Sequence, residues 1–419
     1  MWGETWRAIE DAVVRPPRAR YSDDELLGGR LRHFIVQGAQ GVREDVDIVN
    51  ARGETLKCSY FRPVHWPGQP ARGEDAPPPP SVVYCHCNSG CRVDAAEAVS
   101  LLLPFGVAVM ALDFSGSGRS DGDFVSLGVR EVDDCEAAVA WLRERGATRV
   151  ALWGRSMGAV VSLLYAHRDP TVAGIVCDSP FSQLSRLMVE LASEQATRIP
   201  RTLLRSLVGF LRRSIRRRAG FDIAAADPLS VASSSFAPAL FGHSREDGFI
   251  PFHHSEALHA AYGGDKNLIA FEGEHNAERP EFFNTSVCIF LHNVLGMDFG
   301  ANDSDGADAH AAAALVSPSL TGVTLSPSPQ REVAAGGGGL AGGAALAHLN
   351  AFPSPLTTTD FGQDYAHQAA MEEEAAALDM SGDDDVAGLG AAALIRSEDA
   401  ALLQQALALS LTEPHGATT

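Results

Sequence analysis

Between residues 81 and 296, hydrophobic and polar positions alternate in a regular pattern along the chain. Short apolar runs are each followed by a longer stretch whose apolar residues have helical spacing. The predicted strands are 81–85, 107–112, 150–152, 174–177, 239–242 and 267–271, and the predicted helices are 94–103, 129–144, 157–167, 255–262 and 280–295. Unbroken apolar strands separated by helices are typical of a parallel sheet covered on both faces. We therefore predict a doubly wound, mostly parallel α/β fold.

The first 80 residues follow a different pattern, with a short helix predicted at 6–14 inside an N-terminal extension of residues 1–30. Three runs of alternating apolar and polar residues come next, at 31–36, 46–49 and 56–61. Such alternation is typical of strands that have one solvent-facing side, so we expect antiparallel strands at the edge of the sheet. The main domain is therefore expected to span residues 31–296.

One stretch, residues 182–221, interrupts the alternation because it separates two predicted strands by far more than the usual connection of a few residues. Its leucines recur at helical spacing, as at Leu184 and Leu187, and this spacing predicts an inserted helical cap. Between Arg186 and Arg218 the cap carries nine arginines and only two glutamates. Such a basic surface is either a solvated face or a contact site for an anionic membrane or an acidic substrate.

Net charge distinguishes the end of the chain from the rest. The whole chain has 53 acidic and 33 basic residues, a net charge of −20. From Met297 onward, 17 Asp and Glu stand against two arginines, so this part carries −15 and the first 296 residues carry −5. Because the same part is rich in Ala, Gly, Ser and Asp, we predict that residues 297–395 form a disordered linker. An acidic chain without a cationic domain argues against nucleic-acid binding.

Cysteine usage and targeting signals indicate the compartment. The seven cysteines, an odd number in a long chain, are typical of reduced thiols rather than of a disulfide framework. No apolar run reaches the roughly 18 residues that span a membrane, and the N-terminal residues lack the pattern of a secretory signal. We expect a cytoplasmic protein, with peripheral membrane contact through the cap left open.

A candidate nucleophile lies in the sequence Gly-Arg-Ser-Met-Gly at 154–158. The motif directly follows a predicted strand and precedes a predicted helix. A sharp turn at this junction holds the Ser156 hydroxyl above the sheet, and glycines two residues to either side allow strand and helix to approach closely. The amides at the helix N-terminus stabilise developing negative charge. The context therefore favours a nucleophilic serine over a chance match.

A serine hydroxyl needs a base that is oriented by an acid. Asp247 follows the predicted strand 239–242, and His275 follows the strand 267–271, which is the chain order expected of the acid and the base. Both side chains fall at the carboxyl ends of strands, the edge where open α/β sheets place their ligands. We predict that Ser156, Asp247 and His275 form a catalytic triad.

Other residues compete for these roles. Asp178 ends the strand 174–177 and is an alternative acid. His253 and His254 follow Asp247 closely, but they begin a predicted helix, so capping or surface roles are expected for them.

The oxyanion of an acyl-transfer intermediate needs two hydrogen-bond donors. The backbone amide of Met157, the residue after the nucleophile, is the first candidate. The loop His-Cys-Asn-Ser-Gly after the strand 81–85 offers the amide of Asn88 as the second. The cysteines around this loop and His86 do not have a familiar zinc spacing, so we predict no metal and no cofactor.

Residues 30–296 resemble the α/β-hydrolase superfamily, and more narrowly the serine-aminopeptidase-like (S33-type) hydrolases of plants and protists. The motifs that carry this resemblance lie at 86–92, 113–118, 154–158, 221–223 and 274–276. The resemblance implies a triad at Ser156, Asp247 and His275. Members of this family typically have glycine where this chain has Cys87, which puts the second oxyanion donor in doubt.

The segment 396–414 has the pattern of a short amphipathic helix, with Ser397 as N-cap and Pro414 as terminator. It resembles a ubiquitin-interacting motif, in which a small residue lies between hydrophobic ones on one face and a serine follows. The resemblance implies ubiquitin binding through Leu403, Ala406, Leu407, Ser410 and Glu413. An amphipathic tail that docks on its own domain is the alternative.

Together these features lead to two hypotheses. The first is a serine hydrolase that cleaves an ester, a thioester or an amide of a small-molecule, acyl or peptidyl substrate and is tethered to ubiquitin or ubiquitylated proteins. The second is a catalytically weak ubiquitin adaptor that uses the hydrolase fold as a scaffold, which Cys87 alone supports.

Overall fold

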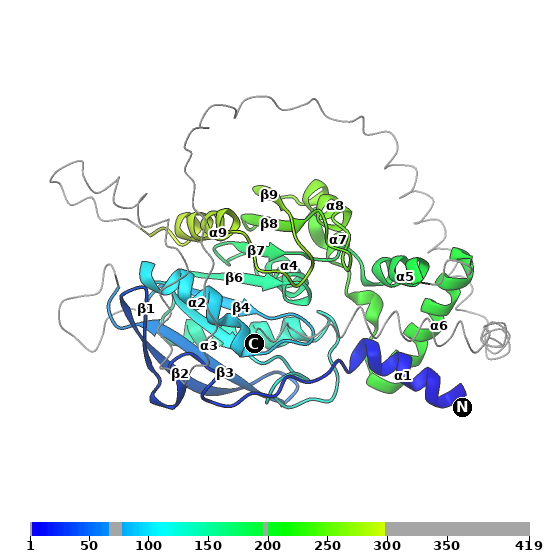
Figure 1. Cartoon of the computed structure of the whole chain (residues 1–419), viewed down its shortest axis with the longest axis horizontal. Helices are drawn as coiled ribbons and strands as arrows, with labels where there is room; N and C mark the ends of the chain where they lie inside the picture. The colour runs from blue at the N-terminus through cyan, green and yellow to red at the C-terminus, as the bar shows by residue number, and fades with distance from the viewer. Residues whose placement is uncertain (1, 67–77, 196–199, 298–419) are drawn as a thin grey trace, which may run out of the picture. The chain divides into compact units, whose positions relative to one another are not determined.

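The computed structural model describes residues 2–66, 78–195 and 200–297. These residues contain one sheet of nine strands in the order β1-β2-β3-β5-β4-β6-β7-β8-β9 (Figure 1). The strands are β1 (His33–Val36), β2 (Ala39–Val49), β3 (Thr55–Pro63), β4 (Ser81–Cys85), β5 (Ala108–Leu112), β6 (Val150–Arg155), β7 (Ile175–Asp178), β8 (Ala239–Ser244) and β9 (Lys266–Phe271). From β5 to β9 all neighbouring strands pair in parallel, so their carboxyl ends meet at one edge of the sheet.

Helices cover both faces of this sheet. The helices are α1 (Trp2–Val14), α2 (Ala96–Leu102), α3 (Glu131–Glu144), α4 (Met157–Arg168), α5 (Leu184–Gln195), α6 (Arg201–Ala219), α7 (Pro228–Ala232), α8 (His253–Ala261) and α9 (Glu281–Val294). Apolar residues of α2 and α9 share a core with one face of the sheet, and those of α3, α4 and α8 share a core with the other. The central strands β4 to β8 are buried almost throughout, which explains their unbroken apolar sequence. The predicted α/β-hydrolase architecture is confirmed.

The antiparallel edge is longer than its sequence pattern predicted. β2 begins at Ala39 rather than at residue 46, because its first half carries the charged residues Arg43 and Asp45. Arg43 is nevertheless buried, and its guanidinium donates to the carbonyls of Leu27 and Gly29 and to the Asp45 carboxylate. A strand whose polar side chains are buried and hydrogen-bonded does not show the alternation of apolar and polar residues, so its sequence pattern does not predict it.

The inserted cap consists of two helices, α5 and α6. Four apolar residues of α6 are buried along one face, Leu204, Leu207, Leu211 and Ile215, whereas Arg201, Arg205 and Arg216 are exposed. Because the apolar face is already occupied, a membrane contact by α6 would depend on charge; that contact stays a prediction.

The N-terminal helix α1 packs on α6 of the cap, a helix that lies far from it in the sequence (Figure 1). The rings of Trp6 and Phe210 contact edge to face with centroids 4.9 Å apart, and the Trp6 indole donates to the Ser214 hydroxyl at 3.2 Å. Arg218 pairs with Glu10 at 2.8 Å. The sequence predicted the helix, but nothing in it indicated this partner.

In the ranges that the structure describes, none of the helices has the length and apolar character needed to cross a bilayer. The predicted linker at 297–395 and the helix at 396–414 lie outside these ranges, apart from Met297.

Candidate active site

Ser156 lies at the apex of the turn between β6 and α4. Its backbone has φ 53° and ψ −117°, a conformation that costs a non-glycine residue about 1–3 kcal/mol. A Cβ on Gly154 would lie 2.0 Å from the Gly158 carbonyl oxygen, and a Cβ on Gly158 would lie 1.9 Å from that of Cys85. Both glycines are therefore required for strand, turn and helix to pack this closely, as the motif predicted.

Asp247 and His275 are joined by a hydrogen bond of 2.6 Å between the carboxylate Oδ2 and the imidazole Nδ1. The other oxygen, Oδ1, accepts the backbone amides of Phe249 and Ile250 at 2.9 and 2.7 Å. Burial alone would raise the pKa of Asp247, but hydrogen bonds to His243 and His275 outweigh it and lower that pKa below its ordinary value. Asp247 is therefore ionised and fixed where it orients the ring of His275.

The His275 imidazole is nearly buried, and the Phe249 ring contacts it edge to face at 4.9 Å. Because Nδ1 donates to the Asp247 carboxylate, Nε2 of a neutral ring carries a lone pair. Ser156 also is almost buried, at the carboxyl edge that these loops share. In the described chain the Ser156 hydroxyl makes no hydrogen bond to His275, so the triad stays a prediction, with only its acid–base pair formed.

Asp178, the alternative acid, does not contact His275. Nε of Arg279 donates to both oxygens of the Asp178 carboxylate, at 3.1 Å to Oδ1 and 2.8 Å to Oδ2. The partner of the histidine is therefore Asp247, and the partner of Asp178 is Arg279.

The loop after β4 lies against the first turn of α4. The close approach of Gly158 to the carbonyls of Cys85 and His86 brings this loop beside Met157, the first residue of α4. Asn88 is almost buried in the same loop. Both predicted oxyanion donors thus belong to neighbouring segments, while their joint action on a substrate stays a prediction.

Cys87 does not disturb the loop backbone. Its φ is not positive, so the position makes no use of the freedom that a glycine would have. Burial raises the pKa of the Cys87 thiol to about 11, which leaves it protonated at neutral pH. The His86 ring holds the loop from both sides, since its Nδ1 bonds to the Cys87 carbonyl at 2.6 Å and its Nε2 accepts the Phe114 amide at 3.1 Å.

His243 lies next to Asp247, and the sequence did not indicate this position. It is fully buried at the end of β8, bonds to the Ile250 carbonyl at 2.7 Å and the Ser255 hydroxyl at 2.6 Å, and lies 3.4 Å from Asp247. A histidine inside a buried strand is the signal that could have identified it.

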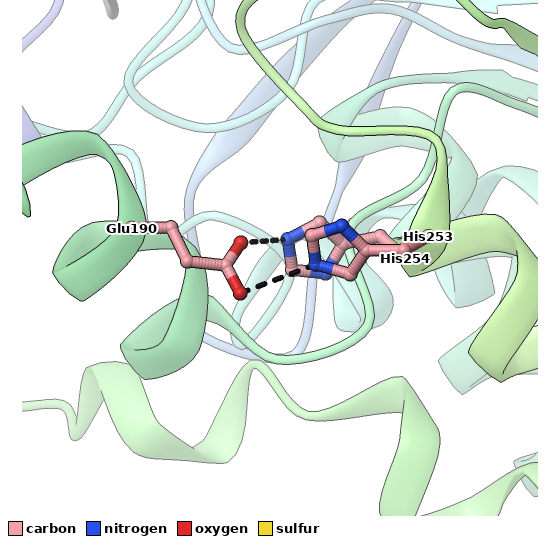
Figure 2. Close-up of side chains that lie close together, drawn as sticks. All are labelled: Glu190, His253 and His254. Atoms are coloured by element: carbon pink, nitrogen blue, oxygen red, sulfur yellow. Dashed lines mark hydrogen bonds and ion pairs between the residues drawn. The ribbon is translucent and has the colours of Figure 1, made fainter. Parts of the chain in front are cut away.

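His253 and His254 join the cap to α8, where Glu190 of α5 accepts both imidazoles on its two carboxylate oxygens, at 3.1 and 2.9 Å (Figure 2). His254 is fully buried, so the expected surface role is wrong for it. Burial would raise the pKa of Glu190, but hydrogen bonds from the two histidines and Arg186 outweigh it and lower that pKa.

These three side chains bring metal-binding atoms within 4.8 Å of one another. The two rings, however, stack at 4.5 Å with only 27° between their planes, so their Nε2 atoms face separate oxygens rather than one point. Arg186 also donates to the same carboxylate at 2.8 Å. The arrangement fits a carboxylate clamp between α5 and α8 better than an ion site.

Comparisons with known proteins agree with this architecture. Residues 77–234, which include Ser156 but end before Asp247, match the family model described as serine aminopeptidase, S33. The uncharacterized protein YqkD of Bacillus subtilis is 31% identical over 225 residues, which cover 52% of this chain and 72% of that protein. An uncharacterized protein of Mycobacterium tuberculosis is 29% identical over 213 residues, covering 50% of this chain and 67% of its own.

Among solved structures, an esterase of Pyrococcus furiosus superposes with a TM-score of 0.50 at 19% identity, covering 67% of this chain and 98% of that one. At this identity the likeness concerns the fold alone. The family match and the similarity to the Bacillus protein together identify the family. The chain belongs to the serine aminopeptidase S33 family of α/β hydrolases.

Proposed function

We propose that this protein is a serine hydrolase that cleaves a carboxylic ester, a thioester or an amide. The observation that carries the proposal is the buried Asp247–His275 pair at the same sheet edge as the strained Ser156 turn. Membership of the family supports hydrolase activity. The proposal that serine is the nucleophile rests on the arrangement of Ser156, Asp247 and His275.

In the proposed mechanism, the Ser156 hydroxyl attacks the substrate carbonyl carbon while its proton passes to Nε2 of His275. Asp247 stabilises the imidazolium that forms. The amides of Met157 and Asn88 donate to the oxyanion of the tetrahedral intermediate. The imidazolium then protonates the departing alcohol, thiol or amine, and a water molecule hydrolyses the acyl-enzyme by the same route.

A fluorophosphonate probe tests the proposal, because it reacts with an activated serine whatever the natural substrate. We expect the wild-type chain to be labelled and Ser156→Ala to be silent. Ser206→Ala, which removes an exposed hydroxyl on α6, is the matched control and should label fully. A wild-type chain that is not labelled would favour the rival function, a ubiquitin adaptor built on the hydrolase fold.

We further propose that the helix expected at 396–414 recruits ubiquitin or ubiquitylated proteins to the hydrolase domain. A single helix of this kind is marginally stable alone and gains stability on a partner surface. In a pulldown on ubiquitin resin, Ala406→Gln and Ser410→Ala should lose binding, because both lie on the predicted contact face with Leu403. Gln405→Ala, on the opposite side in a helical register, should bind like wild type; equal retention of all variants would refute ubiquitin binding.

A further inference from the structure

We propose that Asp178, Arg155 and Arg279 form a buried positioning cluster that holds the backbone of the His275 loop in place for proton transfer from Ser156. The proposal rests on the proposed hydrolase function. None of the three side chains is proposed to touch the substrate; they act through the histidine.

The centre of the cluster is the Asp178 carboxylate, which ends β7 with only 3% of its side chain exposed. It accepts Nε of Arg279 on both oxygens and the Ser179 hydroxyl at 3.0 Å. Arg155 approaches the same carboxylate, with Nε 4.0 Å from Oδ2. An anion beside two guanidinium groups is thereby fixed at the same edge of the sheet as Asp247 and His275.

The remaining nitrogens of both arginines are directed at the histidine loop. Nη2 of Arg155 donates to the carbonyls of His275 and Ala277 at 3.0 and 3.2 Å. Arg279 donates to the same two carbonyls, from Nη2 at 3.1 Å and from Nη1 at 3.0 Å. Four hydrogen bonds therefore converge on two carbonyls of one loop, one of which belongs to His275 itself.

This arrangement ties the base to the nucleophile. Arg155 directly precedes Ser156, so one peptide unit separates the serine from the side chain that holds the His275 backbone. β6 and β9, which carry Ser156 and the His275 loop, are not neighbours in the sheet; β7, whose last residue is Asp178, lies between them together with β8. The cluster thus spans the gap between the two reacting side chains.

The charges explain why the cluster persists when buried. Burial alone would raise the pKa of Asp178, but Arg279 and Arg155 outweigh it and lower that pKa below its ordinary value. A buried ion pair is costly to break because it leaves an unpaired charge, so its geometry is firmly maintained. Such rigidity matters at a catalytic base, since a displacement of about 1 Å costs roughly 100-fold in rate.

The rate of fluorophosphonate labelling tests the cluster in the full-length chain. We expect Arg279→Gln and Asp178→Asn to label Ser156 about 10- to 100-fold more slowly than wild type, given the sensitivity of proton transfer to geometry. Arg155→Lys keeps the charge but loses the planar guanidinium, which places Nη2 on the two carbonyls while Nε lies beside Asp178, so it should also be slow. Arg143→Gln, which breaks a more exposed ion pair with Asp169, is the matched control and should label at the wild-type rate.

A second measurement separates positioning from mere stability. The Nδ1 proton of His275, which bonds to Asp247, should give a downfield NMR resonance in wild type and in Arg143→Gln. In a folded Arg279→Gln or Arg155→Lys variant that resonance should broaden or vanish. A wild-type chain that is not labelled contradicts the hydrolase proposal, whereas folded cluster variants with wild-type labelling rates and an unchanged resonance overturn the positioning role alone.

Discussion

Gly158 shows how one atom decides whether the turn that carries Ser156 can form. The residue brings α4 so close to the end of β4 that the Cys85 carbonyl fills the space a Cβ on Gly158 would need. Backbone cannot move away as a flexible side chain would, so the space is fixed by the sheet. The motif 154–158 is therefore a packing requirement as well as a chemical one.

We predict that Gly158→Ala destabilises the protein by more than about 3 kcal/mol or prevents folding, because backbone must shift to admit the methyl group. Gly209→Ala is the control, since Gly209 lies in α6 with nothing within 4 Å of its would-be Cβ. It should stabilise the protein by about 0.5–1 kcal/mol through helix propensity. Urea unfolding of both variants measures the contrast, and an equal effect of the two would contradict the packing argument.

For single residues, the sequence predicts a functional role when the residue type, its spacing and its order along the chain match a known pattern. Asp247 and His275 were identified because each follows a strand at the expected place, and the structure does pair them. Arg279, in a loop, and Arg155, at the end of β6, were missed, because the local sequence around an arginine does not distinguish a buried ion pair from a solvated charge. Only the fold brings them to Asp178.

Among the elements, α5 and α8 are joined by a set of polar contacts centred on Glu190. Glu190 accepts two imidazoles and one guanidinium, and His254 is held on its other side by Ser182 at 2.7 Å. Because α8 follows the loop that carries Asp247, the clamp connects the cap to the segment that holds the proposed catalytic acid.

We predict that Glu190→Ala destabilises the protein by about 1–3 kcal/mol, because the buried His254 ring loses the acceptor of its Nε2 proton. Glu194→Ala, one turn further along α5 at an exposed position, should change stability by less than about 0.5 kcal/mol. Equilibrium unfolding in urea compares them. If both variants unfold at the wild-type midpoint, the clamp contributes nothing to the attachment of the cap.

Apolar periodicity located most helices and strands to within a few residues, because burial on both faces leaves a plain signal in β4 to β8. It failed where partners are distant or polar. The docking of α1 on α6 depends on Trp6 meeting residues more than 200 positions later, and the early half of β2 is stabilised by the buried Arg43. Neither contact has a local pattern.

For the whole molecule, the fully buried His254 and the half-buried His259 link stability to pH. Burial lowers the pKa of His254 and of His259 below the ordinary value near 6.5. The unfolded chain therefore binds protons that the folded chain does not as pH falls through 6.5, and the unfolded state is favoured. The stabilising contribution is complete above that pH and is lost below it.

We predict that the free energy of unfolding falls between pH 7.5 and pH 5.5, and that His259→Gln reduces this slope. His167→Gln, at an exposed position on α4, should leave the slope unchanged. Urea unfolding across the pH range measures all three proteins. A slope that is the same in His259→Gln as in wild type would mean that other groups cause the acid sensitivity.

The docking of α1 on the cap also has a consequence for biosynthesis. The Trp6 indole bonds to the hydroxyl of Ser214, which is synthesised 208 residues later. At about 5–20 residues per second, translation leaves the amphipathic helix without its native neighbour for roughly 10–40 s. During that interval its apolar stripe is a natural target for chaperones that guard emerging chains, and a slower ribosome would prolong the exposure.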